Sequence, residues 1–208
     1  MNAETELLAG LIELQYGQEV EQKLRRVAVK VPWAKGWPAN DTAFWNAEAF
    51  MWSRKIEKET RELIRNELEF LTGGRNLDVG CGAYSYIPSV GFDLSPKMLD
   101  FNDTCNEKVQ GDLEKKLPFA NGSFDSVTAI FVLNYVKKYE QLLSEIRRVL
   151  RPKGKFVMVL SGTRINEWQR QKEVNSFSVE KWKGILKKGG FMVGLYQKEG
   201  LWFLKCDR

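Results

Sequence analysis

The sequence predicts an α/β fold: a doubly wound, mostly parallel seven-stranded sheet with a C-terminal antiparallel hairpin and an N-terminal helical cap. Three observations support this. After Gly73-Gly74, short apolar runs alternate with stretches of helical periodicity, as in strands linked by crossover helices. The run 127–133 does not alternate between apolar and polar residues, which suits a central strand covered on both faces. Only the four residues 197–200 join the last two strands, whereas a parallel pair needs a crossover of about a dozen residues or more.

Local signals assign each element. Residues 4–26 have helical periodicity, and a second helical stretch begins near Asn40 or Asp41, either of which can be its N-cap. Ser95 caps a further helix, whose first position is Pro96. Helices are also expected at 139–150 and 178–188, a turn at 151–154, and strands at 75–79, 90–93, 108–110, 124–130, 154–160, 191–196 and 201–206.

Length and composition indicate a single domain over residues 1–208, in which 1–72 form the helical cap and 73–208 the core. The chain is 43% hydrophobic and 28% charged, which is typical of a folded protein with a core. No apolar run is long enough to cross a bilayer, and the first residues lack the features of a secretory signal. We therefore expect a cytoplasmic protein with no membrane span.

Two residue counts exclude several kinds of catalysis. The chain contains no histidine, which rules out Ser-His-Asp and Cys-His mechanisms and histidine-ligated zinc, and no metal site is expected. The three cysteines, Cys81, Cys105 and Cys206, are widely separated and form no C-x-x-C pair. That usage fits a reducing compartment.

Charge is distributed unevenly along the chain. Residues 77–135 carry 4 basic and 8 acidic side chains, whereas residues 136–208 carry 17 basic and 7 acidic ones. The basic last third fits either a solvated surface or an anionic partner such as RNA, and a solvated surface is the more ordinary interpretation. A nucleic-acid partner is therefore kept as an alternative but not favoured.

Three aspartates stand where successive strands of the predicted sheet end. Asp78 lies in Leu77-Asp78-Val79-Gly80-Cys81-Gly82, where glycines after a strand let a ligand approach the backbone closely. Asp93 ends the second strand, where a carboxylate can accept hydrogen bonds from both hydroxyls of a ribose. Asp112 ends the third strand and could accept one from an adenine amino group. Because open α/β sheets bind ligands at this edge, the row of aspartates predicts a nucleoside site.

These motifs resemble those of class I S-adenosylmethionine-dependent methyltransferases, a Rossmann-like family that includes enzymes of ubiquinone and menaquinone biosynthesis. The resemblance covers residues 73–206. It is carried by the segments 77–82, 91–99, 111–112, 117–119, 123–127 and 145–154. It implies an enzyme, a transferase that uses S-adenosylmethionine as cofactor and passes its methyl group to a small-molecule acceptor by in-line displacement.

The resemblance also implies a place for each part of the cofactor. The backbone from Gly80 through Cys81 to Gly82 would lie against the methionine part, and Asp78 would orient its ammonium group. Asp93 would hold the ribose hydroxyls. The other implied cofactor contacts are Leu94 and Met98 beside the adenine, Asp112 and Leu113 at its edge, and Ile130 and Phe131 facing the methionine part.

The chain departs from the family's pattern at two points. Tyr84 stands where a third glycine is usual, and only fifteen positions separate Asp78 from Asp93, against about twenty in related folds. The first crossover helix must therefore lose about two turns, and Pro88 limits what remains. We expect a short helical turn or a loop there, with a cofactor site that is either more open or covered by the N-terminal segment.

Methyl transfer needs little from the protein, because the sulfonium is already activated and in-line alignment supplies most of the catalysis. A base is needed only where the acceptor must lose a proton. Asn134 and Tyr135 stand where the resemblance places acceptor-facing residues and are the catalytic candidates, although Tyr135 fits a packing role equally well. Candidates for the acceptor wall are Tyr135, three tryptophans of the cap (Trp33, Trp37 and Trp45), which could instead pack the cap onto the sheet, and Trp168.

Other interpretations fit less well. A nicotinamide dehydrogenase would need a third glycine after Gly80 and Gly82, where this chain has Ser85, and no P-loop motif occurs. The segment after the fourth strand lacks the prolines and the cysteine typical of two classes of DNA methyltransferase. RNA or protein methylation, and cofactor binding without catalysis, stay open as alternatives.

Overall fold

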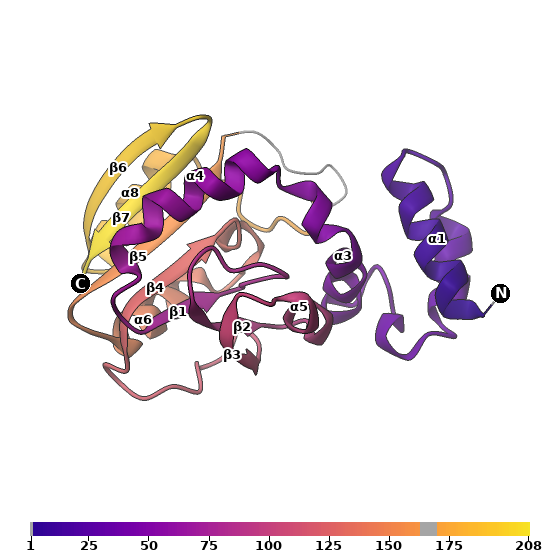
Figure 1. Cartoon of the computed structure of the whole chain (residues 1–208), viewed down its shortest axis with the longest axis horizontal. Helices are drawn as coiled ribbons and strands as arrows, with labels where there is room; N and C mark the ends of the chain where they lie inside the picture. Colours follow the sequence, from indigo (N-terminus) through magenta and orange to yellow (C-terminus); the bar gives the residue numbers. More distant parts are fainter. Residues whose placement is uncertain (1, 163–169) are drawn as a thin grey trace.

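The computed structural model describes residues 2–162 and 170–208. Within them, seven strands form one sheet in the order β3-β2-β1-β4-β5-β7-β6 (Figure 1). β7 runs antiparallel to β5 and β6, and the remaining neighbours are parallel. The strands are β1 (Asn76–Val79), β2 (Ser89–Asp93), β3 (Cys105–Gln110), β4 (Phe124–Ile130), β5 (Leu150–Ser161), β6 (Met192–Lys198) and β7 (Leu201–Asp207). The predicted sheet and its C-terminal hairpin are confirmed.

Helices lie on both faces of this sheet, as the doubly wound prediction requires. The described helices are α1 (Ala3–Gln15), α2 (Glu21–Ala28), α3 (Asp41–Lys55), α4 (Lys58–Leu68), α5 (Pro96–Phe101), α6 (Tyr139–Val149) and α8 (Val179–Lys188). Short 3-10 turns occur at η1 (Pro32–Ala34), η2 (Glu69–Leu71) and η3 (Leu133–Tyr135). Among the described residues, no helix has the length and apolar character needed to span a membrane.

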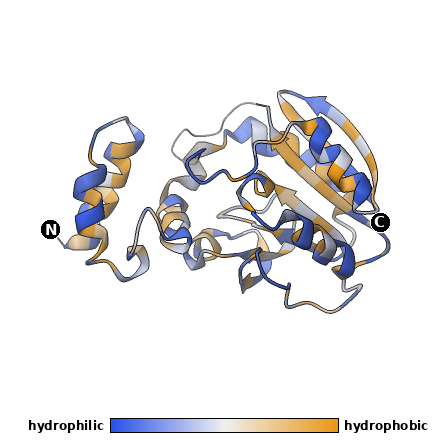
Figure 2. Ribbon diagram, turned by 180° about the vertical axis from the view of Figure 1, so that it is seen from behind, coloured by the Kyte–Doolittle hydropathy of each residue, from blue (hydrophilic) through white to orange (hydrophobic). Residues whose placement is uncertain are grey.

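The strand β5 contributes to two hydrophobic cores, one on each face. Phe156 and Met158 pack in the core beneath α6 and α8, whereas Val157 and Val159 pack with α4 on the opposite face. Successive side chains of a strand point to opposite faces, which explains the division. In the view from behind, hydrophobic residues follow the central strands (Figure 2). The fold is therefore a three-layer arrangement, with the sheet between two layers of helices.

The N-terminal cap contains a helical hairpin that stands away from the sheet (Figures 1 and 2). The sequence predicts one helix over 4–26, but the structure has two, α1 and α2, because the chain turns between them at Gly17. The φ of Gly17 is 80°, a left-handed conformation that glycine adopts at little cost. Leu7 and Leu24, one from each helix, meet in a small core that also contains Phe44 of α3.

The turn predicted at 151–154 is part of β5 rather than a separate element. The register between β4 and β5 shifts between Phe124 and Ser126, and Lys153 has a φ of 65°. Extra residues on one strand of a pair form a bulge of this kind. The predicted strand at 154–160 is thus the inner portion of a longer one.

The link between β1 and β2, residues 80–88, contains no helix. This confirms the predicted short turn or loop. Polar contacts hold it in place: Asn102 Nδ2 donates to the Gly82 carbonyl at 3.0 Å, and the Ser85 N–H donates to Thr104 Oγ1 at 2.8 Å. Side chains at and after the end of α5 therefore help to fix this loop.

Tyr84, at the position of the missing third glycine, points toward α4. Its ring lies edge-on to Tyr86 with centroids 5.3 Å apart, and the Arg61 guanidinium lies 4.8 Å from its centroid. The bulk that replaces the glycine is thus packed under α4, away from the described lining of the cavity considered below.

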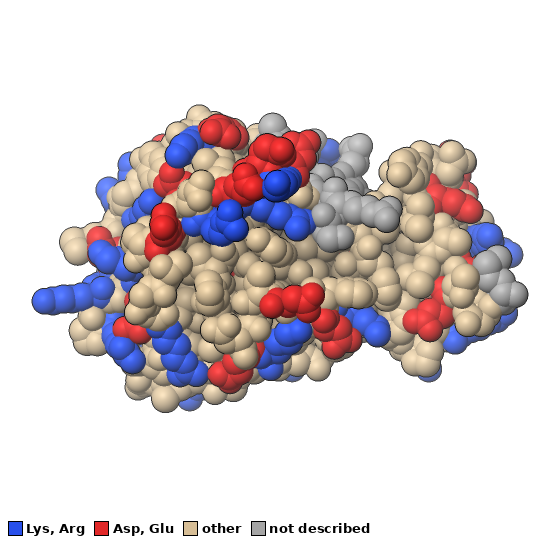
Figure 3. All heavy atoms as spheres, in the orientation of Figure 1, with Lys and Arg blue, Asp and Glu red and all other residues tan. Residues whose placement is uncertain are grey.

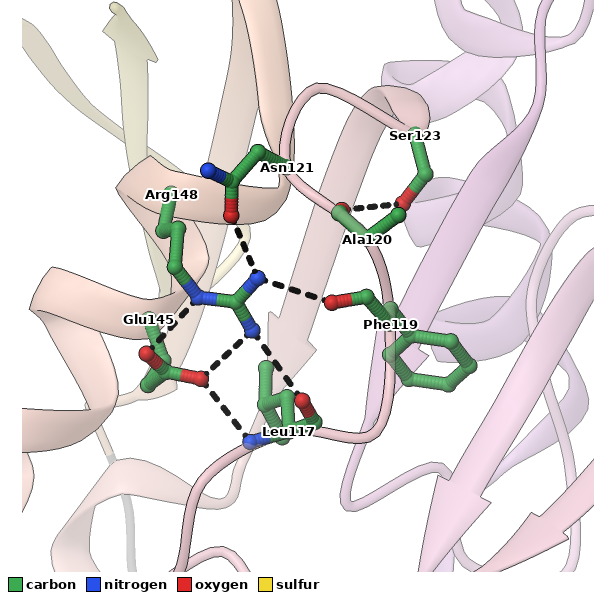
Figure 4. Close-up of polar contacts among 7 residues, drawn as sticks. All are labelled: Leu117, Phe119, Ala120, Asn121, Ser123, Glu145 and Arg148. Carbon is green, nitrogen blue, oxygen red and sulfur yellow. Dashed lines mark hydrogen bonds and ion pairs between the residues drawn. The ribbon is translucent and has the colours of Figure 1, made fainter.

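The segment between β3 and β4 is tied to α6 by an ion pair (Figure 4). Arg148 donates to the carbonyls of Leu117 and Phe119 at 3.0 and 2.8 Å, and Glu145 accepts from Arg148 and from the Leu117 N–H. The hydrogen bonds from Arg148 lower the pKa of Glu145, so the pair is held charged. The path of the chain after Asp112 is fixed by these contacts.

Candidate cofactor and acceptor site

A cavity of about 490 Å³ lies at the carboxyl edge of the sheet, where β1, β2 and β4 end. Its volume is within the range of about 300–1,000 Å³ found for small-molecule sites. Its described lining contains Ala39, Asp41, Trp45, Trp52, Gly80, Gly82, Asp93, Leu94, Met98, Asp112, Leu113, Glu114, Ile130, Phe131, Val132, Tyr135, Val136, Lys137, Gln171, Lys172 and Val174. Most of the predicted nucleoside-site residues are therefore brought together.

The turn after β1 presents bare backbone to the cavity. Gly80 and Gly82 have φ values of 64° and 59°, which favour glycine. A Cβ on Gly80 would lie 2.2 Å from Val132 Cγ2, so a larger residue would have to displace its neighbour. The Gly80 N–H donates to the Phe92 carbonyl at 2.7 Å and fastens the turn to β2. The space left by the missing Cβ atoms is taken up by Val132 at Gly80 and by Trp52 at Gly82, so a ligand meets this turn beside those two side chains.

Asp93 lies at the end of β2 with 8% of its surface exposed, and it lines the cavity. Its two carboxylate oxygens accept the N–H groups of Gly82 and Ser95, both at 2.9 Å. The Leu94 N–H also acts on this carboxylate, and because a carboxylate has about four lone-pair sites, it keeps acceptor capacity for a ligand's hydroxyl. Burial raises the pKa of Asp93 to about 6, and the carboxylate is ionised at neutral pH.

The remaining predicted cofactor contacts in the lining are mostly apolar. Asp112 lies two residues beyond the end of β3, and its Oδ1 accepts the Glu114 N–H at 2.9 Å. Phe131 has a φ of 57°, an uncommon strained conformation for a bulky residue, as often found at functional sites. Leu94, Met98, Leu113 and Ile130 complete this group. The donors, acceptors and apolar surfaces present fit the adenosine part of S-adenosylmethionine.

Two predicted cofactor residues, Asp78 and Cys81, are absent from this described lining. Asp78 is 3% exposed, and its carboxylate accepts hydrogen bonds from Ser85 at 2.7 Å and Thr128 at 2.8 Å. Burial raises the pKa of Asp78 to about 7. The shortened link places Ser85 directly against Asp78, so this side chain braces the loop instead of facing a ligand. The Cys81 thiol is buried near Gly91, away from the cavity.

Tyr135 faces the cavity from η3, and Trp45 of α3 lies edge-on to it with centroids 5.0 Å apart. Burial, with the negative charges of Glu173 and Glu48, raises the pKa of Tyr135. Its hydroxyl therefore stays protonated at neutral pH and can donate a hydrogen bond rather than act as a base. Asn134 is not in the described lining, and its carbonyl accepts the Val174 N–H at 2.9 Å.

The tryptophans of the cap divide into two pairs. Trp33 and Trp37 are absent from the described lining: Trp33 donates to Glu4 at 2.8 Å, and Trp37 is buried in the core of the cap. Trp45, a candidate for the acceptor wall, lines the cavity. So does Trp52, whose Nε1 would lie 3.2 Å from a Cβ on Gly82. Of the two options left open for the cofactor site, cover by the N-terminal segment is therefore the one observed.

A contact between distant segments bridges the cavity lining. Lys172 donates to Asp41 Oδ1 at 2.6 Å and to the Ala39 carbonyl at 3.1 Å, which joins the chain after β5 to the start of α3. Asn175 of the same segment donates to the Val136 carbonyl at 2.6 Å, which ties the segment to the residue after η3 as well. The predicted acceptor candidate Trp168 lies outside the described residues.

Sequence reasoning missed several lining residues. Trp52 is seven positions after Trp45 on one helix, a spacing that indicates a shared face and could have found it. Glu114 and Lys172 carry no comparable signal, because their roles depend on contacts with segments far away in the chain. Among the residues that the structure describes, no group of three or more acidic or cysteine side chains could hold a metal ion.

The family model and the curated relatives to which this chain is similar are all described as methyltransferases. Residues 77–158 match the family model described as a methyltransferase domain. The chain is similar to the demethylmenaquinone methyltransferase of Staphylococcus saprophyticus, 29% identical over 180 residues that cover 64% of this chain and 77% of that protein. It is also similar to the fatty-acid O-methyltransferase of Mycolicibacterium smegmatis, 34% identical over 115 residues that cover 47% and 42%.

The chain spans half or less of the length of several other curated relatives. Among solved structures, it resembles a chain in the complex between the Haloferax volcanii Trm112 methyltransferase activator and a methyltransferase. The TM-score is 0.62 at 18% identity, with 78% of this chain and 96% of that chain covered. At this identity the likeness shows a shared fold.

Proposed function

We propose, from the premise that this chain is a class I S-adenosylmethionine-dependent methyltransferase, that it methylates a small molecule held between Trp45, Tyr135 and Val174. The observation that carries the proposal is a single cavity lined both by the predicted nucleoside residues and by these aromatic and apolar side chains. When bound, the cofactor supplies an activated methyl group on its sulfonium. The chain's own residues have to bind it, orient it and present the acceptor in line.

For the cofactor, we assign the ribose hydroxyls to the Asp93 carboxylate. Leu94, Met98 and Leu113 would enclose the adenine, and Asp112 would accept from its amino group. The methionine part would lie along Gly80 and Gly82, opposite Ile130 and Phe131. Asp78 and Cys81 contribute indirectly in this scheme, because both support the turn from the side away from the cavity.

The acceptor compartment favours a small and largely apolar acceptor. Trp45, Tyr135 and Val174 provide apolar surface, and the bridge from Lys172 to Asp41 restricts the room for a polymer. On the face drawn in Figure 3, acidic and basic side chains are interspersed. The names of the two relatives refer to a demethylmenaquinone and a fatty acid, both apolar molecules, which supports the same choice.

Tyr135 would orient the acceptor by donating a hydrogen bond, since its raised pKa keeps the hydroxyl protonated at neutral pH. Acceptors that do not have to pass a proton to Tyr135 therefore suit this compartment best.

The described cysteines are free, which fits a cytoplasmic, reducing environment.

The test begins with calorimetric titration of S-adenosylmethionine and S-adenosylhomocysteine, with NADH as control. We expect saturable binding in the micromolar range, about −8 kcal/mol, and none with NADH. Transfer of a labelled methyl group is then measured to quinols, fatty acids, RNA and protein. Absence of binding at millimolar cofactor would contradict the proposal. Transfer only to RNA or protein would replace its acceptor, and binding without any transfer would favour a non-catalytic role.

A further inference from the structure

Glu114 connects the part of the cavity proposed for the cofactor with the part proposed for the acceptor, although no sequence motif singles it out. It lies two residues after Asp112 and lines the cavity. Its Oε1 accepts the Lys137 N–H at 2.6 Å, and its Oε2 accepts the Lys138 N–H at 3.0 Å. Its own N–H donates to Asp112 Oδ1 at 2.9 Å. A chain of hydrogen bonds therefore runs from Asp112 to the backbone that immediately follows Tyr135.

The position of the Glu114 carboxylate is favourable for this connection. Lys138 is the N-cap of α6 and supplies no side-chain cap of its own. Glu114 therefore provides an acceptor for backbone N–H groups at a helix start, where they lack partners within the helix. Its negative charge is also favourable there, because the helix dipole is positive at that end. Both hydrogen bonds are charge-assisted, so they are stronger than bonds between neutral groups.

The segment that carries Asp112 and Glu114 is fastened on both sides. Before it, the Gly111 N–H donates to the Asp93 carbonyl at 2.9 Å. After it, Leu117 is held by Glu145 and Arg148, as drawn in Figure 4. Because both ends of this short segment are held, it cannot move as a whole when Asp112 is displaced. A change at Asp112 is therefore passed on to Glu114.

The segment that Glu114 holds, residues 132–138, also has defined contacts. Tyr135 belongs to η3, and its N–H donates to the Val132 carbonyl at 2.9 Å, while Lys137 follows two residues later. The Lys137 and Lys138 N–H groups thus fix the end of the loop whose middle carries Tyr135. Loss of their acceptor would loosen this end of the loop, while Asn175 would still hold the carbonyls of Leu133 and Val136.

We propose that Glu114 is a positioning residue that couples cofactor occupancy at Asp112 to the order of the acceptor wall around Tyr135. Cofactor bound at Asp112 holds Glu114, and Glu114 holds the start of α6 and the preceding loop. The acceptor then meets a wall that is already ordered, which gives positive coupling between the two ligands. The inference rests on the proposed function, because it takes Asp112 as a cofactor contact.

The test is amide hydrogen exchange of the full chain with and without saturating S-adenosylhomocysteine. In the parent protein, the ligand should slow exchange both at 80–82 and at 136–139, by about fivefold or more at the second site. In Glu114→Gln, one of the two acceptor oxygens becomes an amide donor. Protection at 80–82 should persist, while the ligand-dependent slowing at 136–139 should fall below about twofold.

The matched control is Glu140→Gln, which removes an exposed charge from the first turn of the same helix, α6. It should keep the parent's response at both sites. The readout is the ratio of exchange rates with and without ligand. A merely structural role for Glu114 would raise both rates together and leave that ratio unchanged, and such a result overturns the proposal.

Further outcomes separate this inference from the proposed function. Ligand protection at 80–82 but not at 136–139 in the parent protein overturns the coupling alone. No protection at either site overturns the cofactor assignment as well. If Glu114→Gln does not fold, Glu114→Asp keeps the charge on a side chain one methylene shorter. That variant should show a weakened ratio at 136–139, and an unchanged ratio again overturns the proposal.

Discussion

The proposed cofactor part and the proposed acceptor part of the cavity are built in different ways. The first stands on the ends of β1, β2 and β4, so Gly80, Asp93 and Ile130 are placed by the register of the sheet. The second consists of segments outside the sheet, joined by side-chain contacts such as the one between Lys172 and Asp41. Backbone hydrogen bonding within the sheet therefore fixes the proposed cofactor part, whereas contacts between distant side chains determine what lies beside it.

The largest effect is expected from Asp93→Ala, which tests the part fixed by the sheet. Loss of two charge-assisted hydrogen bonds, each worth about 1.5–3 kcal/mol, should weaken S-adenosylhomocysteine binding by at least about a hundredfold. Calorimetric titration measures this. Because Asp93 also accepts the Gly82 and Ser95 N–H groups, thermal melting must show that the variant is folded. An unchanged affinity in a folded variant would remove Asp93 from the site.

The same residue predicts a dependence on pH. The raised pKa of Asp93, about 6, means that its carboxyl gains a proton as the pH falls through 6 and then has fewer acceptors for ribose hydroxyls. Cofactor affinity should therefore be full above about pH 7 and fall by up to about tenfold per unit below pH 6. In Asp93→Asn this part of the profile should be flat. A parent profile without the fall would contradict the assignment.

A smaller effect is expected from Trp52→Leu, because Trp52 of α3 lies beside Gly82 and offers the cofactor packing rather than a charged acceptor. The methionine part of the cofactor should lose packing and one potential N–H donor, worth together about 1–1.5 kcal/mol, or about fivefold to tenfold in affinity. Methylthioadenosine, which lacks the amino-acid group, is the matched probe. Its affinity should hardly change, and an equal loss for both ligands would place Trp52 beside the adenosine instead.

The sequence predicted the strand ends that line the proposed cofactor part, because the signals for them are local. The strand expected at 124–130 has those bounds in the structure, and Asp93 stands at the strand end where its motif placed it. The position of Asp78 outside the cavity lining and that of Trp52 within it were not predicted. Both have one physical cause, the short link at 80–88. It brings Ser85 onto Asp78 and leaves the turn at Gly82 to be covered by Trp52. Such contacts depend on how separate segments pack, and periodicity carries no information about that.

The acceptor part was predicted only in fragments for the same reason. Four tryptophans lie close together in the cap sequence, yet only Trp45 and Trp52 face the cavity, because they share one side of α3. Trp33 and Trp37 precede that helix and pack elsewhere. A cluster in the sequence therefore indicated the right element without identifying the right side chains.

The smallest effect is expected from Lys172→Met, which keeps most of the side chain's length but removes its charge. Lys172 is largely buried at 17% exposure, whereas Asp41 is 59% exposed, so the pair should contribute only about 0.2–1 kcal/mol to the free energy of unfolding. S-adenosylhomocysteine affinity should change by less than about twofold, because the sheet edge is untouched. Denaturant unfolding and calorimetry measure the two quantities. A large loss of cofactor affinity would show that the acceptor side also holds the cofactor, and would break the distinction between the two parts.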